Sequence, residues 1–140
     1  MTGLSVVING CGRIGAELAR LLDAEGHEVV VIDVDPEAFR RLARTFRGGA
    51  VVGDGIDAGI QRRAGVDKAD AFIALTDGDN HNAMASQIAK HMMGVPIVIS
   101  QIKDPLRQET YHLLGIETVS PTLIGAERIM EEFLGRRTGT

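Results

Sequence analysis

The stretch VVINGCGRIGAELARLL, residues 6–22, decides the fold of this 140-residue chain. An apolar run passes into GCGRIG (residues 10–15), an intact G-x-G-x-x-G motif, and then resumes with the spacing of a helix. These glycines alone would fit any tight turn, but between a predicted strand and a predicted helix they indicate dinucleotide binding. We expect Gly10 to permit the turn, Gly12 to let the backbone approach a pyrophosphate, and Gly15 to bring helix and strand together.

The rest of the chain alternates short apolar runs with amphipathic segments. Strands are predicted at 4–9, 28–33, 50–52, 71–75, 96–100 and 117–119, and helices at 13–25, 36–46, 57–64, 79–93, 105–114 and 121–134. Unbroken apolarity, as in residues 29–32, is typical of strands buried on both faces of a parallel sheet. The sequence therefore predicts an α/β fold, a Rossmann-like doubly wound parallel six-stranded sheet in the order 3-2-1-4-5-6.

One domain accounts for the whole length. We expect residues 1–120 to form the nucleotide-binding unit, and residues 121–140 to add a C-terminal helix and a frayed tail, GRRTGT, to the same domain. The apolar residues of that helix leave two interpretations open, packing on its own sheet or on a second subunit. They are Leu123, Ala126, Ile129, Met130, Phe133 and Leu134.

Composition narrows the function classes. The formal charge of −4 argues against nucleic acid as a partner, and an aromatic content of 4% offers no stacking platform for single strands. The single cysteine, Cys11, fits a reducing compartment, and no signal peptide or membrane-spanning run is visible. These features predict a cytoplasmic domain.

Acidic side chains at the ends of the second and third strands complete the motif. Asp33 lies 18 residues after Gly15, close to the spacing of an acid that binds ribose hydroxyls. A carboxylate there would repel a 2′-phosphate, so NAD or an adenosine nucleotide is favoured over NADP. Asp35 precedes Pro36 and is better interpreted as a helix cap. Asp54, in Gly53-Asp54-Gly55, fits an acceptor for an adenine amino group and a plain turn residue equally well.

Further polar residues flank the glycine motif and the fourth strand. Arg13 stands at the positive end of the first helix, where a cation is unfavourable unless an anion balances it, so a phosphate contact and a solvated charge remain equal alternatives. Thr76 follows the fourth strand, where it could face the ribose or the phosphates, and Asp79 is expected to cap the next helix.

Candidate catalytic groups are few. His27, His81, His91 and His112 are scattered, and surface or helix-face positions are expected for each. No Ser/His/Asp arrangement and no metal-ligand spacing occurs in the sequence. Cys11 fits a small filler of the loop better than a reactive thiol. We therefore expect a nucleotide-binding domain without chemistry of its own. The alternative is a cofactor-binding subunit of an NAD-dependent oxidoreductase with its catalytic residues on another chain.

The combination of segments resembles the N-terminal domain of the RCK family, also called KTN or Trk-type NAD-binding domains. The resemblance rests on GCGRIGAELARLL, GHEVVVIDVDPE, VVGDGID, AGVDKADAFIALTDGDNHN, ASQIAKH and LGIETVSPTLIGAERI. It implies a cytoplasmic regulator of a membrane potassium channel or transporter that binds NAD(H), ATP or ADP and pairs into dimers or larger rings. It departs at SQIKDP, which lacks an arginine of the family pattern.

The resemblance also implies residue roles. The three glycines would hold phosphates, Arg13 would reach them or those of a neighbouring subunit, Asp33 would bind ribose, Asp54 would bind the adenine side, and Thr76 and Asn82 would line the crevice. The expected cofactor-binding set is Gly10, Gly12, Arg13, Ile14, Gly15, Asp33, Val34, Asp54, Gly55, Thr76 and Asn82.

Overall fold

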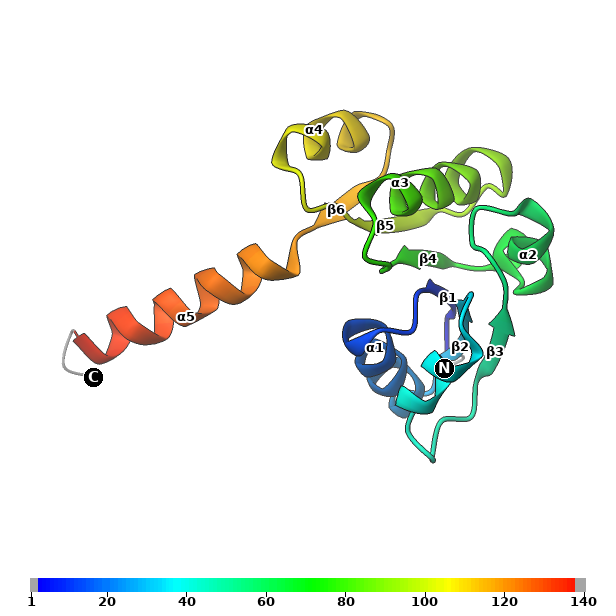
Figure 1. Ribbon diagram of the computed structural model, residues 1–140, viewed down its shortest axis with the longest axis horizontal. Helices are drawn as coiled ribbons and strands as arrows, with labels where there is room; N and C mark the ends of the chain where they lie inside the picture. The colour runs from blue at the N-terminus through cyan, green and yellow to red at the C-terminus, as the bar shows by residue number, and fades with distance from the viewer. Residues whose placement is uncertain (1–2, 138–140) are drawn as a thin grey trace.

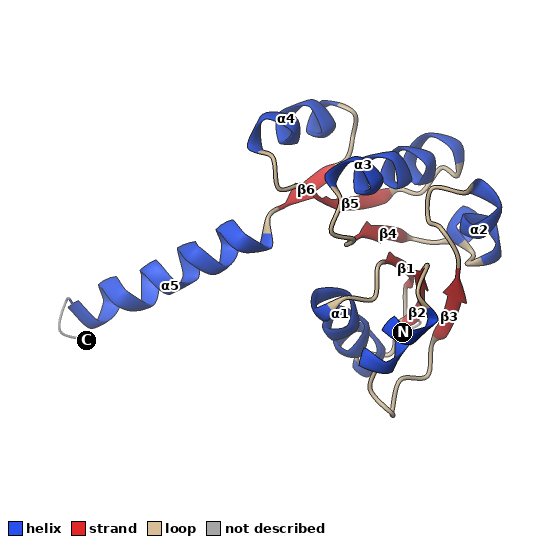
Figure 2. Ribbon diagram, in the orientation of Figure 1, coloured by secondary structure: helices blue, strands red, loops and turns tan. Residues whose placement is uncertain are grey.

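A computed structural model describes residues 3–137. Its single sheet consists of six parallel strands in the order β3-β2-β1-β4-β5-β6, which confirms the predicted doubly wound fold (Figures 1 and 2). The strands are β1 Ser5–Asn9, β2 Glu28–Asp33, β3 Gly49–Val52, β4 Ala71–Ala74, β5 Ile97–Gln101 and β6 Glu117–Val119. The chain order reverses between β1 and β4, so their carboxyl ends flank the point where such folds bind ligands.

Both faces of the sheet are buried. On one face, strand residues such as Val6 and Ile8 pack against helix α1 (Arg13–Ala24) and the 3₁₀ helix η1 (Pro36–Arg41). On the other face, residues such as Val7 and Phe72 pack against α2 (Ala58–Arg63), η2 (Val66–Lys68) and α3 (Asp79–Gln87). Neighbouring residues of β1 thus serve opposite cores, which explains why the strands read as unbroken apolar runs.

Two predicted helices differ from the structure. The helix expected at 36–46 is only the short η1, and residues 42–48 form a loop in which Leu42 and Phe46 pack on the α1 side of the sheet. The guanidinium of Arg47 donates to the backbone oxygen of Asp23 at 3.1 Å, so tertiary contacts override the helical pattern here. The helix expected at 79–93 divides into α3 and the π-helical turn η3 (Ile88–Met92), and this wider turn accompanies the burial of both Ala89 and Met93.

Helices α4 (Pro105–Leu113) and α5 (Pro121–Arg137) complete the chain. Figure 1 shows α5 as an arm that extends away from the sheet. Large apolar residues in this helix are more than half exposed, as in Leu123 (54%) and Ile129 (71%). The interpretation that this helix packs on its own sheet is therefore wrong. The helix also continues to Arg137, into the predicted frayed tail, and residues 138–140 lie outside the described part.

None of the helices within residues 3–137 is both long and apolar enough to span a membrane.

Candidate nucleotide-binding site

A cavity of about 590 Å³ opens at the carboxyl ends of the central strands. Its walls come from the loops after β1, β2, β3 and β4, which the strand order brings to one edge of the sheet. The lining residues are Asn9, Gly10, Cys11, Gly12, Asp33, Val34, Asp35, Ala38, Arg41, Asp54, Gly55, Leu75, Thr76, Asp77, Gly78 and His81. The volume lies within the range of about 300–1,000 Å³ that holds small ligands and cofactors.

The glycine motif forms the floor of the cavity where α1 begins. Gly10 adopts a φ of +116°, a conformation that L side chains rarely adopt, and a Cβ at Gly15 would lie 2.0 Å from the Gly10 carbonyl oxygen. Both glycines therefore play the structural roles that the motif predicts. A Cβ at Gly12, in contrast, would meet no described atom within 4 Å, so this position faces open space.

The first turn of α1 has the features of an anion-binding helix start. Its N-cap, Gly12, makes no side-chain capping bond, and no acidic residue occupies the first turn. The free N–H groups of a helix start and the positive end of the helix dipole attract phosphate. The residues present thus fit the pyrophosphate of a dinucleotide or the phosphates of an adenine nucleotide.

Asp33 and Asp35 form one wall of the cavity. The Oδ2 atom of Asp33 accepts from the Cys11 N–H at 2.8 Å, and its Oδ1 accepts from the Asp35 N–H at 2.9 Å. Each oxygen makes one described bond and retains capacity for a second, as ribose hydroxyls would require. Asp35 caps η1 as predicted, accepting from the Glu37 N–H at 3.0 Å, and also lines the cavity.

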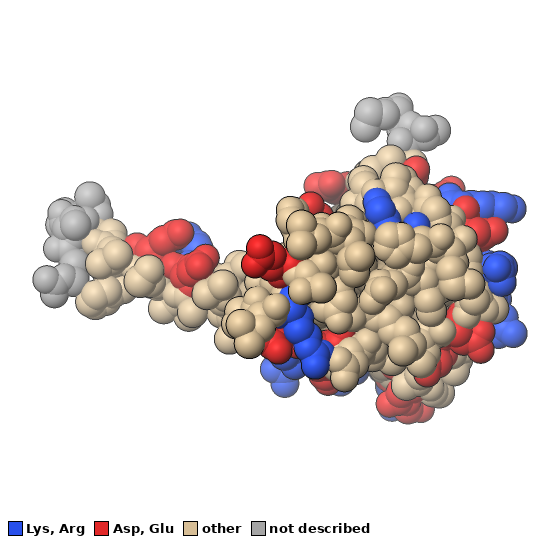
Figure 3. Space-filling view, turned by 90° about the horizontal axis from the view of Figure 1, so that it is seen from above, with Lys and Arg blue, Asp and Glu red and all other residues tan. Residues whose placement is uncertain are grey.

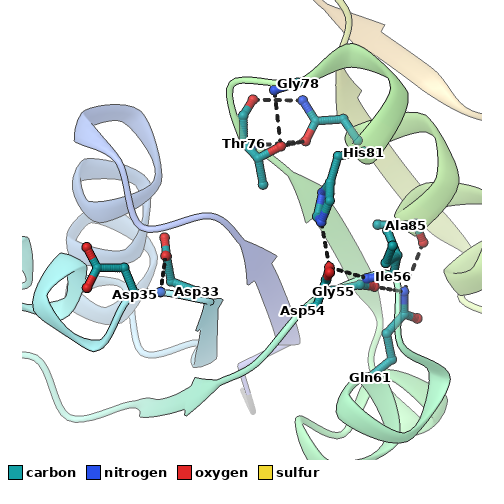
Figure 4. A network of polar contacts seen from close by, with 11 residues as sticks. Asp33, Asp35, Asp54, Gly55, Ile56, Gln61, Thr76, Gly78, His81 and Ala85 are labelled. Atoms are coloured by element: carbon teal, nitrogen blue, oxygen red, sulfur yellow. Dashed lines mark hydrogen bonds and ion pairs between the residues drawn. The ribbon is translucent and has the colours of Figure 1, made fainter.

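Asp54 and His81 form the opposite wall, across from Asp33 in Figure 4. His81 Nε2 lies 2.6 Å from Asp54 Oδ1, and the Ile56 N–H donates to the same oxygen at 3.1 Å. Asp54 Oδ2 has no partner among residues 3–137, so it is available to a ligand. Burial raises the pKa of Asp54, but the bonds from Ile56 and His81, with the charge of His81, outweigh burial and hold the pKa below its ordinary value.

Asn82 fixes the loop after β4 from beneath. Its Oδ1 accepts from the Thr76 N–H at 2.9 Å and from the Thr76 hydroxyl at 2.6 Å. Its Nδ2 donates to the carbonyl oxygens of Thr76 at 2.8 Å and Gln101 at 2.9 Å. Asn82 is fully buried and lies outside the cavity lining, so it supports Thr76 rather than facing the crevice as expected. Because Thr76 donates its hydroxyl proton to Asn82, it offers a ligand an acceptor.

Most residues of the expected set line this one cavity, including Val34, which is 64% exposed. Arg13 and Ile14 instead border a neighbouring hollow of about 410 Å³. Asp79 does not cap α3. It is the first residue of that helix and accepts from the Lys103 and Asp104 N–H groups at 2.8 and 2.9 Å.

Several residues that line the cavity were not expected from the sequence, and His81, Arg41 and Asn9 are three polar ones among them. His81 stands one residue before Asn82, where helical spacing alone does not reveal that it reaches Asp54. Arg41 lies at the end of η1, on a segment expected to continue as a helix. Asn9 is a polar residue in an apolar strand, which is a detectable signal. It is 2% exposed, and its Nδ2 has no hydrogen-bond partner among the described residues.

The sheet order, the glycine motif and the cavity define the class of the protein as a Rossmann-like domain with a nucleotide-type site. Comparison with known families gives the particular family: the TrkA-N domain model matches residues 6–121, and the chain belongs to that family.

Individual relatives agree with this assignment. A Trk system potassium uptake protein TrkA from Streptomyces coelicolor is 44% identical over 131 residues, covering 94% of this chain and 59% of that protein. Among solved structures, the GsuK channel bound to NAD is 26% identical, with a TM-score of 0.70, over 86% of this chain and 22% of that one. GsuK bound to ADP is 25% identical, with a TM-score of 0.70, over 86% of this chain and 31% of that one. The chain spans about three fifths of the Streptomyces protein.

Proposed function

We propose that this chain is a nucleotide-sensing regulatory domain of a potassium transport system, binding NAD(H), or ATP or ADP in the same cavity. One observation carries the proposal. The Asp33 carboxylate, placed to accept from ribose hydroxyls, and the uncapped start of α1, placed for phosphate, line a single cavity. Relatives named for potassium uptake, and a channel structure bound to NAD, support the choice of system.

The binding residues divide by the part of the ligand they would hold. Gly10, Gly12 and the first turn of α1 would receive phosphates, and Asp33 would receive ribose. Asp54, through its unoccupied Oδ2, would accept from an adenine amino group. When NAD is bound it could supply hydride chemistry, but in this proposal the residues named here bind the nucleotide and hold it in place.

Helix α5 would transmit the effect of nucleotide binding from this domain to a second subunit. Leu123, Ile124, Ile129 and Met130 are each more than half exposed. In Figure 3 charged side chains gather on one side of the α5 arm, while the opposite side is uncharged. We propose that a second copy of the chain covers the uncharged side, so that residues 1–120 form the sensing unit and the helix pairs two such units.

A membrane channel or transporter is the further partner in this proposal, with the paired domains acting on its cytoplasmic side. A nucleotide changes the arrangement of the pair only as far as its affinity differs between arrangements. NAD(H) and ADP therefore act as signals to the extent that each favours a different arrangement.

The test combines sedimentation and turnover on the same samples. The purified chain is examined by analytical ultracentrifugation and small-angle scattering with and without NAD, NADH and ADP, and the nucleotides are then recovered and analysed. A regulator changes its assembly or shape on binding and returns each nucleotide unchanged. With a cell extract added as the source of electron donors and acceptors, NADH oxidation or NAD reduction faster than in the extract alone, without any change of assembly, would instead indicate an oxidoreductase subunit.

A further inference from the structure

The start of α1 fits phosphate groups, but the side chains that line the cavity carry a net negative charge that opposes them. The described lining carries four carboxylates, Asp33, Asp35, Asp54 and Asp77. Against them stands one guanidinium, that of Arg41, since His81 is already engaged with Asp54. A nucleotide with two or more phosphate charges therefore needs a local cation in addition to the start of α1.

Arg41 stands where that cation is needed. Its Nη1 donates to the carbonyl oxygen of Cys11, inside the glycine motif, at 3.3 Å. This is its one described hydrogen bond, so most of its five N–H donors remain for a ligand. Arg41 also lines both the main cavity and the hollow of about 410 Å³ beside it, together with Gly12. A ligand that extends from the cavity along the start of α1 passes this guanidinium.

Neighbouring arginines do not share this position. Arg40, the preceding residue of η1, is 82% exposed in its side chain and pairs with Glu37 at 2.7 Å. Arg13, the cation that the family resemblance favours, shares two side hollows with Arg41 but lies outside the described lining of the main cavity. Arg41 is thus the guanidinium that both lines the main cavity and bonds to the glycine motif.

We infer that Arg41 is the specificity-determining cation of the site: it binds the phosphate groups next to the glycine motif, so that the domain distinguishes ADP and NAD from uncharged adenosine. This inference rests on the proposed function, because it names the residue that recognises the anionic part of the same ligand. The guanidinium forms paired, charge-assisted hydrogen bonds to phosphate oxygens, a geometry that lysine reproduces only in charge.

The field of Arg41 already acts on the motif. Burial and the Asp33 carboxylate raise the pKa of the Cys11 thiol, while Arg41 opposes them. Positive potential from Arg41 thus reaches the loop over which a phosphate would lie.

The test compares charged and uncharged ligands on matched variants. Adenosine, ADP and NAD are titrated calorimetrically into the wild type, Arg41→Gln, Arg41→Lys, Arg40→Gln and Arg13→Gln. We expect Arg41→Gln to weaken ADP and NAD binding by about tenfold or more, the loss of a charge-assisted bond, and adenosine by less than about twofold. Arg41→Lys is expected to fall between the wild type and Arg41→Gln, and Arg40→Gln to match the wild type.

Three results would overturn the inference while leaving the proposed function intact. They are equal ADP affinity in the wild type and Arg41→Gln, an equal loss for adenosine and ADP, or a loss confined to Arg13→Gln. A wild type that binds none of the three ligands contradicts the proposed function itself, and the inference falls with it. Because Arg41 is exposed, Arg41→Gln should melt together with Arg40→Gln. If it does not, the ADP affinities of Arg41→Lys and the wild type are compared instead. Weaker ADP binding by Arg41→Lys supports the inference, and equal binding overturns it.

Discussion

The sheet domain and helix α5 use apolar residues in opposite ways. In the domain, Val7, Ile32 and Phe72 are at most 1% exposed and pack in the core on the α2 and α3 face of the sheet. In α5, Ile129 and Met130 are 71% and 55% exposed. The same residue types thus stabilise the fold in one region and form a surface in the other. An apolar pattern alone does not indicate whether a helix packs on its own chain or on another.

The largest expected difference is in the free energy of unfolding after alanine substitution in the sheet domain and in α5. We expect Phe72→Ala to lower the free energy of unfolding by about 3–5 kcal/mol, because it leaves a cavity in the core beneath α3. Ile129→Ala, on the exposed helix, should change it by less than about 0.5 kcal/mol. Urea denaturation at low protein concentration measures both values. A loss of more than 2 kcal/mol in Ile129→Ala would mean that α5 belongs to the core after all.

The glycine motif allows a matched comparison within the domain. Gly15→Ala places a Cβ 2.0 Å from the Gly10 carbonyl oxygen, so we expect a loss of about 3 kcal/mol, at the upper end for overpacking. Gly12→Ala meets open space and should keep the stability near that of the wild type while weakening nucleotide binding. Thermal melting and titration with ADP distinguish the two. Equal melting temperatures for both variants would contradict the close approach of helix and strand.

A smaller loss of stability is expected when Asn82, which holds the loop after β4, is replaced. Asn82→Ala removes the acceptor of the Thr76 N–H and one donor to each of the Thr76 and Gln101 carbonyl oxygens, and we expect a loss of about 2 kcal/mol. Asn80→Ala is the control, because Asn80 is exposed on the same helix and, within residues 3–137, its side chain bonds to Arg107 alone. Hydrogen exchange of the Thr76 amide should rise in Asn82→Ala alone. Unchanged exchange would argue against the supporting role.

The smallest effect on stability is expected at the contact between Asp54 and His81 in the cavity wall. The folded pKa of Asp54 is lowered, so its contribution to stability is complete above the ordinary value of 3.8 and is lost as the pH falls through the folded pKa. Asp54→Asn should therefore be less stable than the wild type at pH 6, by no more than about 1 kcal/mol, and the gap should close below pH 3.8. Urea denaturation across this range measures the gap. A gap that widens toward acid would reverse the sign of the coupling.

The sequence predicted the parts of the molecule that depend on local pattern. Strand order followed from the alternation of apolar runs and helices, and the roles of Gly10 and Gly15 followed from a motif with fixed geometry. Asp33 and Asp54 could be located because Asp33 ends β2 and Asp54 follows β3, and the carboxyl ends of these strands meet at one edge.

Other features depend on tertiary contacts that no local pattern records. The early end of η1 accompanies the packing of the partly buried Leu42 and Phe46 on the α1 side, and this end places Arg41 at the cavity. The reach of His81 to Asp54 joins residues 27 positions apart. Asn82 looked like a lining residue because its neighbours line the cavity, but its helical position turns it inward.

The most direct measurement is calorimetric titration of the chain with NAD, ADP and NADP, using Asp33→Ala and the exposed, distant Asp67→Ala as variants. We predict binding of NAD or ADP and poor binding of NADP, because the 2′-phosphate of NADP would meet Asp33. Affinity should fall by about tenfold or more in Asp33→Ala. Asp67→Ala should match the wild type. NADP bound as tightly as NAD, or Asp33→Ala with unchanged affinity, would contradict the assignment of this cavity to an adenine nucleotide held through its ribose.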